Sequence, residues 1–168
     1  REAAGLPAQC RLPAPPGGRH LRDSRMLVPS FEREAASTMP RIEHVALWTQ
    51  DIARLRDFYA QHFGARPGPP YRNPAHAFES CFLEFDGGAR LEIMRTGQLD
   101  LVHAQPGAQR HGLTHLAVSV GSEQRVDALT RELGAAGHPV LDGPRRTGDG
   151  YYESVVLDPD GNRIEITV

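Results

Sequence analysis

The feature that most constrains this chain is a pattern that occurs twice. The segments "DGGARLEIM" and "DGNRIEITV" each place a glutamate between aliphatic residues just after an Asp-Gly turn, and the second one ends the chain. Each half also opens with a strand-like segment that contains one histidine, "RIEHVALWT" and then "GLTHLAVSV". An internal repeat of this length indicates two structural modules that share a core.

The elements expected in the two halves follow the same order. Residues 41–49 and 112–120 predict strands because apolar and polar residues alternate there. Asp51 and Gly64 are typical of the start and end of a helix, as are Ser122 and Gly137. Hairpins are predicted over 77–95 and 151–168, with a short strand near 138–142 and a loop at about 96–112. These elements predict an α+β fold of two tandem βαβββ modules.

The first 38 residues differ from the rest of the chain. They contain five prolines, show no sustained helical or strand period, and lack the apolar core of a signal peptide. We expect residues 1–38 to be an N-terminal extension that is not part of the fold. The folded domain is expected over 39–168, with module one at about 41–95 and module two at about 113–168.

Composition excludes several classes of function. A formal net charge of -2 gives no basic footprint for nucleic acid. No apolar run approaches the roughly 20 residues that a membrane-spanning helix needs, and a chain without lysine cannot use a lysine Schiff base. Cys10 and Cys81 form no metal-binding or redox spacing, as is typical of a cytosolic chain with free thiols. We expect a cytoplasmic protein with a small-molecule substrate.

Four polar residues share one face of the predicted sheets. Side chains alternate between the faces of a strand, and the helices must cover the aliphatic face of each module. Singly, each polar residue on the other face is typical of a solvated strand position. As a repeated set, two imidazoles and two carboxylates suit one divalent ion of Zn, Ni, Co, Mn or Fe. The predicted ligands are His44, Glu92, His115 and Glu165.

The chain resembles the glyoxalase/bleomycin resistance/dioxygenase superfamily, which has the vicinal oxygen chelate fold. The resemblance covers nearly all of 41–168 and is strongest in "IEHVALWTQD", "FYAQHFGARPG", "FDGGARLEIM", "GLTHLAVSV" and "GYYESVVLDPDGNRIEI". It implies paired modules whose curved mixed sheet surrounds a metal-containing cavity, with ligands on the first and last strands of each module. The four predicted ligands fall on those positions, in the order His, Glu, His, Glu of bacterial glyoxalase I-like proteins.

The resemblance implies a lyase or isomerase with one divalent metal ion per site. A small substrate with vicinal oxygens would bind the ion, which would stabilise an enediolate-type intermediate when a C–H proton leaves. Glu165 or Glu92 would act as the base, with a preference for Glu165 by analogy. The family also implies a homodimer. Whether each metal site forms within one chain or between two chains stays open.

Two positions depart from the glutathione-dependent pattern of glyoxalase I. Trp48 stands where that enzyme has an arginine that helps to hold glutathione, and Thr96 stands where it has an asparagine. We therefore expect a substrate that does not carry glutathione. Trp48 and Met94 lie on the predicted ligand face and are candidates for an apolar cavity floor, although ordinary sheet packing explains them equally well.

Other functions remain open at this point. A metal-free protein of the bleomycin-binding type would use shape and aromatic stacking, and such proteins generally lack the four-residue set. An extradiol-type dioxygenase would need Fe²⁺ and usually has two histidines and one carboxylate. Among residues of the predicted loops, His76, His103 and His111 could line a cavity rim, and Arg145 and Arg146 could meet an anionic substrate.

Overall fold

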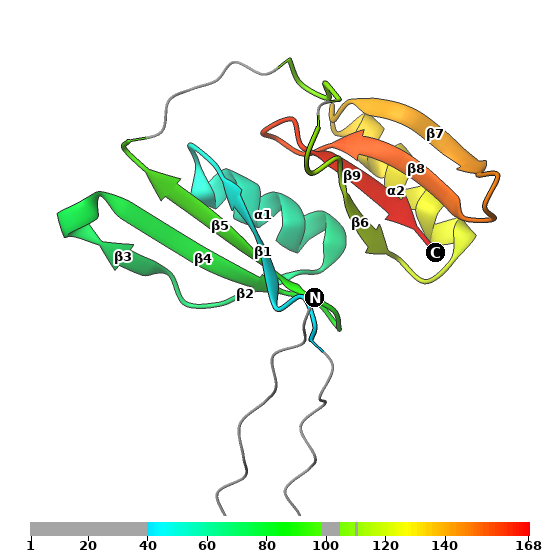
Figure 1. The fold of residues 1–168 in the computed structure, drawn as a ribbon. Helices are drawn as coiled ribbons and strands as arrows, with labels where there is room; N and C mark the ends of the chain where they lie inside the picture. The colour runs from blue at the N-terminus through cyan, green and yellow to red at the C-terminus, as the bar shows by residue number, and fades with distance from the viewer. Residues whose placement is uncertain (1–39, 99–104, 110) are drawn as a thin grey trace, which may run out of the picture. The chain divides into compact units, whose positions relative to one another are not determined.

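The structure is a computed structural model that describes residues 40–98, 105–109 and 111–168 (Figure 1). The predicted extension at 1–38 lies outside the described residues, as does part of the loop between the modules. Module one contains β1 (His44–Trp48), α1 (Ile52–Phe63), β2 (Arg66–Pro67), β3 (Tyr71–Asn73), a short 3-10 helix η1 (Pro74–His76), β4 (Phe78–Glu84) and β5 (Arg90–Thr96). Module two contains β6 (Leu116–Ser119), α2 (Glu123–Ala135), β7 (Val140–Arg146), β8 (Tyr152–Leu157) and β9 (Arg163–Thr167).

Each module forms its own mixed sheet. The strand order is β1-β5-β4-β2 in module one, where β3 also pairs with β4, and β6-β9-β8-β7 in module two. In both modules the first strand runs parallel to the last, and the two strands of the final hairpin run antiparallel. The predicted α+β class with two tandem modules is therefore confirmed. β1 and β6 lie at the edges of their sheets.

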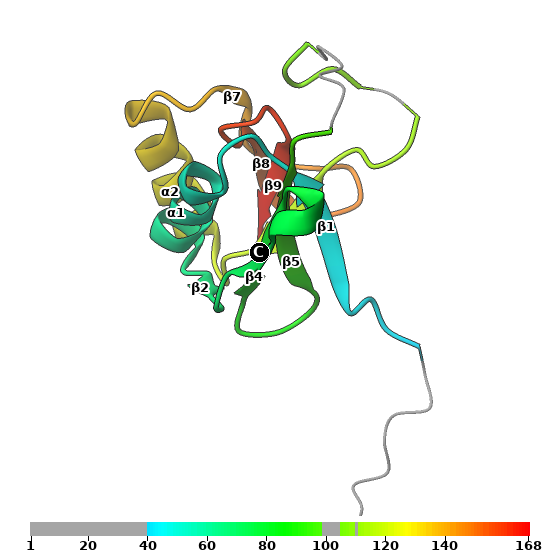
Figure 2. The same ribbon diagram turned by 90° about the vertical axis from the view of Figure 1, so that its left-hand side faces the viewer.

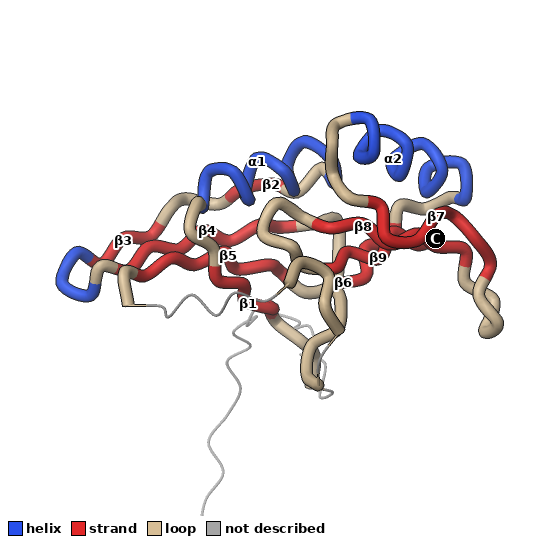
Figure 3. Tube along the Cα trace, turned by 90° about the horizontal axis from the view of Figure 1, so that it is seen from above, coloured by secondary structure: helices blue, strands red, loops and turns tan. Residues whose placement is uncertain are grey.

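The helices begin where the sequence predicts. The Asp51 side chain accepts a hydrogen bond from the backbone N–H of Arg54 at 3.0 Å, and Gly64 ends α1 in the left-handed conformation at φ 67°. Ser122 accepts from the backbone N–H of Arg125 at 3.2 Å at the start of α2. That helix ends at Ala135, slightly earlier than predicted. Figures 2 and 3 show that each helix lies along one face of the sheet of its own module.

The hydrophobic core lies between the helices and the sheets. Leu55 and Tyr59 of α1 are fully buried, as are Val126, Leu129 and Leu133 of α2. The sheet residues that face them belong to the same cluster: Leu47, Cys81, Leu83, Leu91, Ile93, Val156, Ile164 and Ile166. Burial of each large aliphatic side chain contributes about 1.5–3 kcal/mol. Glu92 and Glu165 lie on the opposite faces of the sheets, between the core residues of β5 and β9, as the alternation predicts.

Contacts in the described residues also join the two modules. The phenol of Tyr59 donates a hydrogen bond to Asp158 at 3.1 Å, and Arg54 pairs with Asp160. The rings of Phe58 and His138 lie 4.8 Å apart. None of the described helices is long and apolar enough to cross a membrane.

Candidate metal and substrate site

The four predicted ligands form two His–Glu pairs, one in each module. His44 Nε2 lies 3.8 Å from Glu92 Oε2, and His115 Nε2 lies 3.4 Å from Glu165 Oε2. The parallel pairing of the first and last strands positions both pairs, because it sets Ala46 opposite Glu92 and Ala117 opposite Glu165. Two donors on one ion, each bonded at about 2.1 Å, stand roughly 3 Å apart at a right angle. Each pair is close to that separation.

The structure does not bring the two pairs together as a set of four. Within the ranges that the structure describes, no three His, Cys, Asp or Glu side chains lie close enough to hold a metal ion. The side chains of His44 and His115 are 40% and 42% exposed, whereas those of Glu92 and Glu165 are 16% and 17% exposed. Each pair thus presents an accessible imidazole over a half-buried carboxylate, and each supplies half of the predicted donor set.

A second contact orients His44. Its Nδ1 lies 2.6 Å from a carboxylate oxygen of Glu43, which leaves Nε2 directed toward Glu92. The hydrogen bond to His44 is the largest cause that lowers the pKa of Glu43. The His44 ring also stands edge-on to Phe82, with centroids 5.4 Å apart. A carboxylate on the far nitrogen is the usual outer partner of a metal-binding histidine.

A further carboxylate near the predicted ligands, that of Glu153 in β8 of module two, was missed by sequence reasoning. The strand register sets Val155 opposite Glu165, so Glu153 lies diagonal to Glu165 on the same face. Burial raises the pKa of Glu153, and the neighbouring Glu165 raises it further, whereas Arg145 at 3.7 Å acts in the opposite direction.

The repeat itself hid this residue. Comparing "FES" with "YES" places Glu153 level with Glu79, but the hairpin registers differ from that comparison by one residue. Cys81 pairs with Ile93 in module one and Ser154 pairs with Ile166 in module two, so Glu153 corresponds to Ser80. Counting back from each predicted ligand through the hairpin would have found it.

The candidates for the cavity floor lie beside Glu92. Trp48 pairs with Met94 across β1 and β5, on the same face as Glu92. Trp48 is 46% exposed, and its ring stands edge-on to that of Phe78, with centroids 6.2 Å apart. Thr96 pairs with Phe78 at the same end of the sheet. An aromatic surface therefore adjoins the His44–Glu92 pair.

The histidines and arginines of the predicted loops occupy different kinds of position in the structure. His111 lines a pocket of about 300 Å³ together with His115, whereas His76 is exposed in η1. His103 lies outside the described residues. Arg145 and Arg146 belong to β7 rather than to a loop, and they pair with Asp142 and Glu123.

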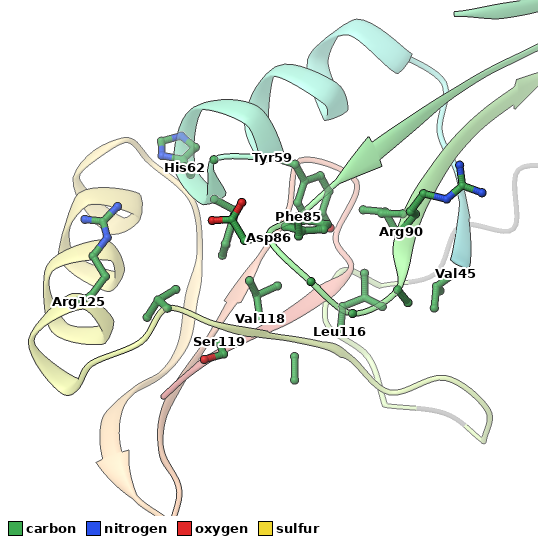
Figure 4. A pocket seen from close by; sticks show the side chains of 18 of the residues that line it. Val45, Tyr59, His62, Phe85, Asp86, Arg90, Leu116, Val118, Ser119 and Arg125 are labelled. Carbon is green, nitrogen blue, oxygen red and sulfur yellow. The ribbon is translucent and has the colours of Figure 1, made fainter. Parts of the chain in front are cut away.

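A larger cavity of about 770 Å³ lies between α1, the β4–β5 turn and β6 (Figure 4). Its walls include Tyr59, Phe85, Leu116 and Val118, and none of the four predicted ligands lines it. Leu116 and Val118 were expected to be covered by a helix, but they are half-buried and line this cavity instead. The cavity is therefore distinct from the predicted metal site.

Comparison with known proteins identifies the family. A sequence profile of the Glyoxalase/Bleomycin resistance protein/Dioxygenase superfamily matches residues 41–166. The uncharacterized protein YqjT of Bacillus subtilis is 40% identical over 60 residues, which cover 34% of this chain and 47% of that protein. Glyoxalase I from Zea mays superposes with a TM-score of 0.61 at 21% identity, over 76% of this chain and 44% of the maize chain.

A glyoxalase family protein from Enterococcus faecalis superposes with a TM-score of 0.60 at 25% identity, over 76% of this chain and 97% of that chain. This chain thus spans less than half the length of YqjT and of the maize enzyme, and the likeness to the maize structure shows a shared fold. The profile, in contrast, matches most of the chain and both modules. The protein belongs to the glyoxalase/bleomycin resistance protein/dioxygenase superfamily.

Proposed function

We propose that this protein is a divalent-metal-dependent lyase or isomerase of the glyoxalase type, acting on a small substrate with vicinal oxygens. The observation that supports this most strongly is the approach of a histidine and a glutamate on the same open face of each module, at 3.8 and 3.4 Å. The fold alone does not require a histidine and a glutamate at these equivalent positions of both modules. A bound ion that both pairs share would explain the repeated arrangement.

The donor set favours a first-row ion such as Ni, Co, Zn, Mn or Fe, because imidazole nitrogens and carboxylate oxygens suit these metals. His44 and Glu92 would hold it from module one, and His115 and Glu165 from module two. When bound, the ion would polarise the two adjacent oxygens of the substrate. The Glu43 carboxylate, 2.6 Å from the far nitrogen of His44, would keep that imidazole in the orientation that binding requires.

Glu165 is the base that we favour. Its carboxylate is 17% exposed, so a proton taken from the substrate carbon would move into a site with little water. Glu153 lies beside it, and burial raises the pKa of Glu153. A proton on Glu165 would relieve the repulsion between these two carboxylates. Glu92 would act as the base if module one presents the substrate carbon.

We further propose that the site is completed in a homodimer, with His44 and Glu92 from one chain and His115 and Glu165 from its partner. The separation of the two pairs within one chain supports this arrangement. So does the position of β1 and β6 at sheet edges, which leaves their outer backbone groups to pair elsewhere. Large apolar side chains near these edges are exposed: Ile42, Trp48, Leu113 and Val168.

The substrate that we propose does not carry glutathione. Trp48 and Thr96 replace the two polar residues that the family pattern uses for glutathione, and Trp48 forms an exposed aromatic contact with Phe78. A small substrate would instead rest on the apolar surface of Trp48 and Met94 beside Glu92.

Elemental analysis of the purified protein tests this function. After separate loading with Ni²⁺, Co²⁺, Zn²⁺, Mn²⁺ and Fe²⁺, we expect about one tightly bound ion per chain with at least one of them. The variants Glu92→Gln and Glu165→Gln should lose the ion, because each removes one carboxylate donor. Glu84→Gln is the matched control, since Glu84 is an exposed glutamate of β4 outside the predicted donor set.

Absence of a stoichiometric ion under every loading would contradict the proposal. In that case metal-free ligand binding of the bleomycin type would become the favoured function. The variants Glu92→Gln and Glu165→Gln would then bind the ligand as tightly as the native protein. Tight binding of Fe²⁺ alone, with oxygen consumption in the presence of a catechol, would favour an extradiol-type dioxygenase.

A further inference from the structure

The internal repeat supplies a comparison between two arginines. Arg90 stands two residues before Glu92, and Arg163 stands two residues before Glu165, so each arginine shares a face with a predicted ligand. The strand registers make the two positions equivalent, because Val45 pairs with Leu91 and Leu116 pairs with Ile164. Because the backbone positions are equivalent, differences between the contacts of the two arginines come from the neighbouring side chains in each module.

In module one the charge of Arg90 is neutralised. Its Nε donates to a carboxylate oxygen of Glu43 at 2.8 Å, and its terminal nitrogen also pairs with that carboxylate. The guanidinium lies over the ring of Phe82, with its central carbon 4.2 Å from the centroid. Glu43 thus binds Nε and a terminal nitrogen of this guanidinium, and Phe82 covers one of its faces.

In module two both partners are replaced. Thr114 precedes His115 as Glu43 precedes His44, and Val155 pairs with Glu165 as Phe82 pairs with Glu92. Arg163 Nε donates to the carbonyl of Gly107 at 2.9 Å, which fixes the side chain. Among the ion pairs of residues 40–98, 105–109 and 111–168, none includes Arg163.

Arg163 lines the pocket of about 300 Å³ together with His115. The polar side chains that line this pocket are Gln105, His111, Thr114, His115, Asp160, Asn162 and Arg163. Asp160 is the acidic member of the set, and it pairs with Arg54. The pocket therefore combines hydrogen-bond donors with a half-buried positive charge that no described acidic residue neutralises.

We propose that Arg163 is a substrate-binding residue that holds a carboxylate of the substrate in this pocket, next to the vicinal oxygens at His115 and Glu165. This inference rests on the proposed function and adds a substrate class to it, a small carboxylic acid. Nε is bound to Gly107, and among the described residues neither terminal nitrogen has a hydrogen-bond partner, so the two could bind a carboxylate side by side. Arg90 cannot take this role because Glu43 already binds its Nε and one of its terminal nitrogens.

Two ligands that differ by one carboxylate test the assignment. Acetohydroxamate binds a metal ion through two adjacent oxygens, and succinic monohydroxamate has the same chelating group with an added carboxylate. Isothermal titration of the metal-loaded protein should show tighter binding of the second compound by about tenfold, as expected for a charge-assisted hydrogen bond. Arg163→Gln should bring this ratio to about one while acetohydroxamate binding stays unchanged.

Thr114→Glu is a second test that keeps the arginine. It should recreate the Glu43–Arg90 pair in module two, neutralise Arg163 and abolish the tenfold preference. Arg90→Gln is the matched control and should keep the preference. Circular dichroism and thermal unfolding of all three variants would show that the fold is retained.

The outcomes separate this inference from the proposed function. Equal binding of both hydroxamates by the native protein would overturn the carboxylate site and leave the metal site standing. A preference that survives in Arg163→Gln, or is lost in Arg90→Gln, would also overturn it. Failure of acetohydroxamate to bind under any metal loading would overturn the proposed function, and the inference with it.

Discussion

Two histidines pack against the same phenylalanine where α1 approaches the loop after α2. The rings of His62 and His138 lie 5.3 and 4.8 Å from that of Phe58, and 5.6 Å from each other. Burial lowers the pKa of His62, and the neighbouring His138 and Arg125 lower it further, whereas Glu132 raises it. This contact between the modules is therefore most favourable when His62 is neutral.

This arrangement predicts a pH-dependent stability at the residue scale. The pKa of an unfolded histidine is about 6.5, and that of His62 is lowered in the folded state. As the pH falls, the histidine is therefore protonated in the unfolded state before it is protonated in the folded state. Its contribution to stability is therefore complete above that pH and is lost as the pH falls toward the folded pKa. Urea unfolding between pH 8 and pH 5 should show a flatter pH dependence for His62→Gln than for the native protein. Exposed His76→Gln is the control, and equal slopes for native protein and His62→Gln would contradict the prediction.

At the scale of elements, the buried carboxylate of Asp158 links the β8–β9 turn to α1, in addition to the Arg54–Asp160 pair. Asp158 Oδ2 accepts a hydrogen bond from the Tyr59 hydroxyl at 3.1 Å. Asp158 Oδ1 accepts from the backbone N–H groups of Asp160 and Asn162, at 2.9 and 2.8 Å. The same side chain thus shapes the turn that precedes the predicted ligand on β9 and ties it to module one.

Removal of either partner should destabilise the protein by different amounts. Tyr59→Phe removes one hydrogen bond and should lower the free energy of unfolding by about 1–2 kcal/mol. Asp158→Ala leaves the Tyr59 hydroxyl and two turn amides without their acceptor, and should lower it by about 3 kcal/mol or more. Urea denaturation would measure both. Exposed Tyr71→Phe should change stability little, and an equally small effect of Asp158→Ala would show that water replaces these bonds.

The elements differ in how well the sequence predicts them, and the reason is the range of the interactions that form them. Both helices could be predicted because their caps, such as Asp51 and Ser122, act within a few residues. The short strands β2 and β3 were not predicted individually, because they lie in the proline-rich segment "ARPGPPYRN" and depend on pairing with distant β4. β7 is longer than expected for the same reason, since Arg145 and Arg146 pair with β8.

At the scale of the whole molecule, the sheet faces of the candidate ligands could be predicted from the sequence, but the spatial grouping of these residues could not. Alternation along a strand decides which face carries His44 or Glu165, and that is visible in the sequence. Whether the module-one pair meets the module-two pair depends on how the modules pack, which no local pattern records. The described residues keep the pairs apart, so the complete site that we propose requires a second chain.

Mixing two variants that each lack half of the ligands would test whether the site forms between two chains. One variant carries His44→Ala and Glu92→Gln, and the other carries His115→Ala and Glu165→Gln, so each homodimer lacks half of every site. A heterodimer would contain one site with both altered halves and one site with both native halves. We therefore expect recovery of about one tightly bound ion per heterodimer after the variants are unfolded and refolded together.

The same mixture discriminates between the two geometries of the site. If all four ligands of a site came from one chain, every chain in the mixture would lack two of them, and no tight ion would be recovered. Each variant refolded alone is the control and should bind no tight ion under either geometry. Size-exclusion chromatography of the native 18.5 kDa chain should show a dimer, because the exchange requires one. A monomeric native protein that still binds the ion tightly would place the whole site within one chain.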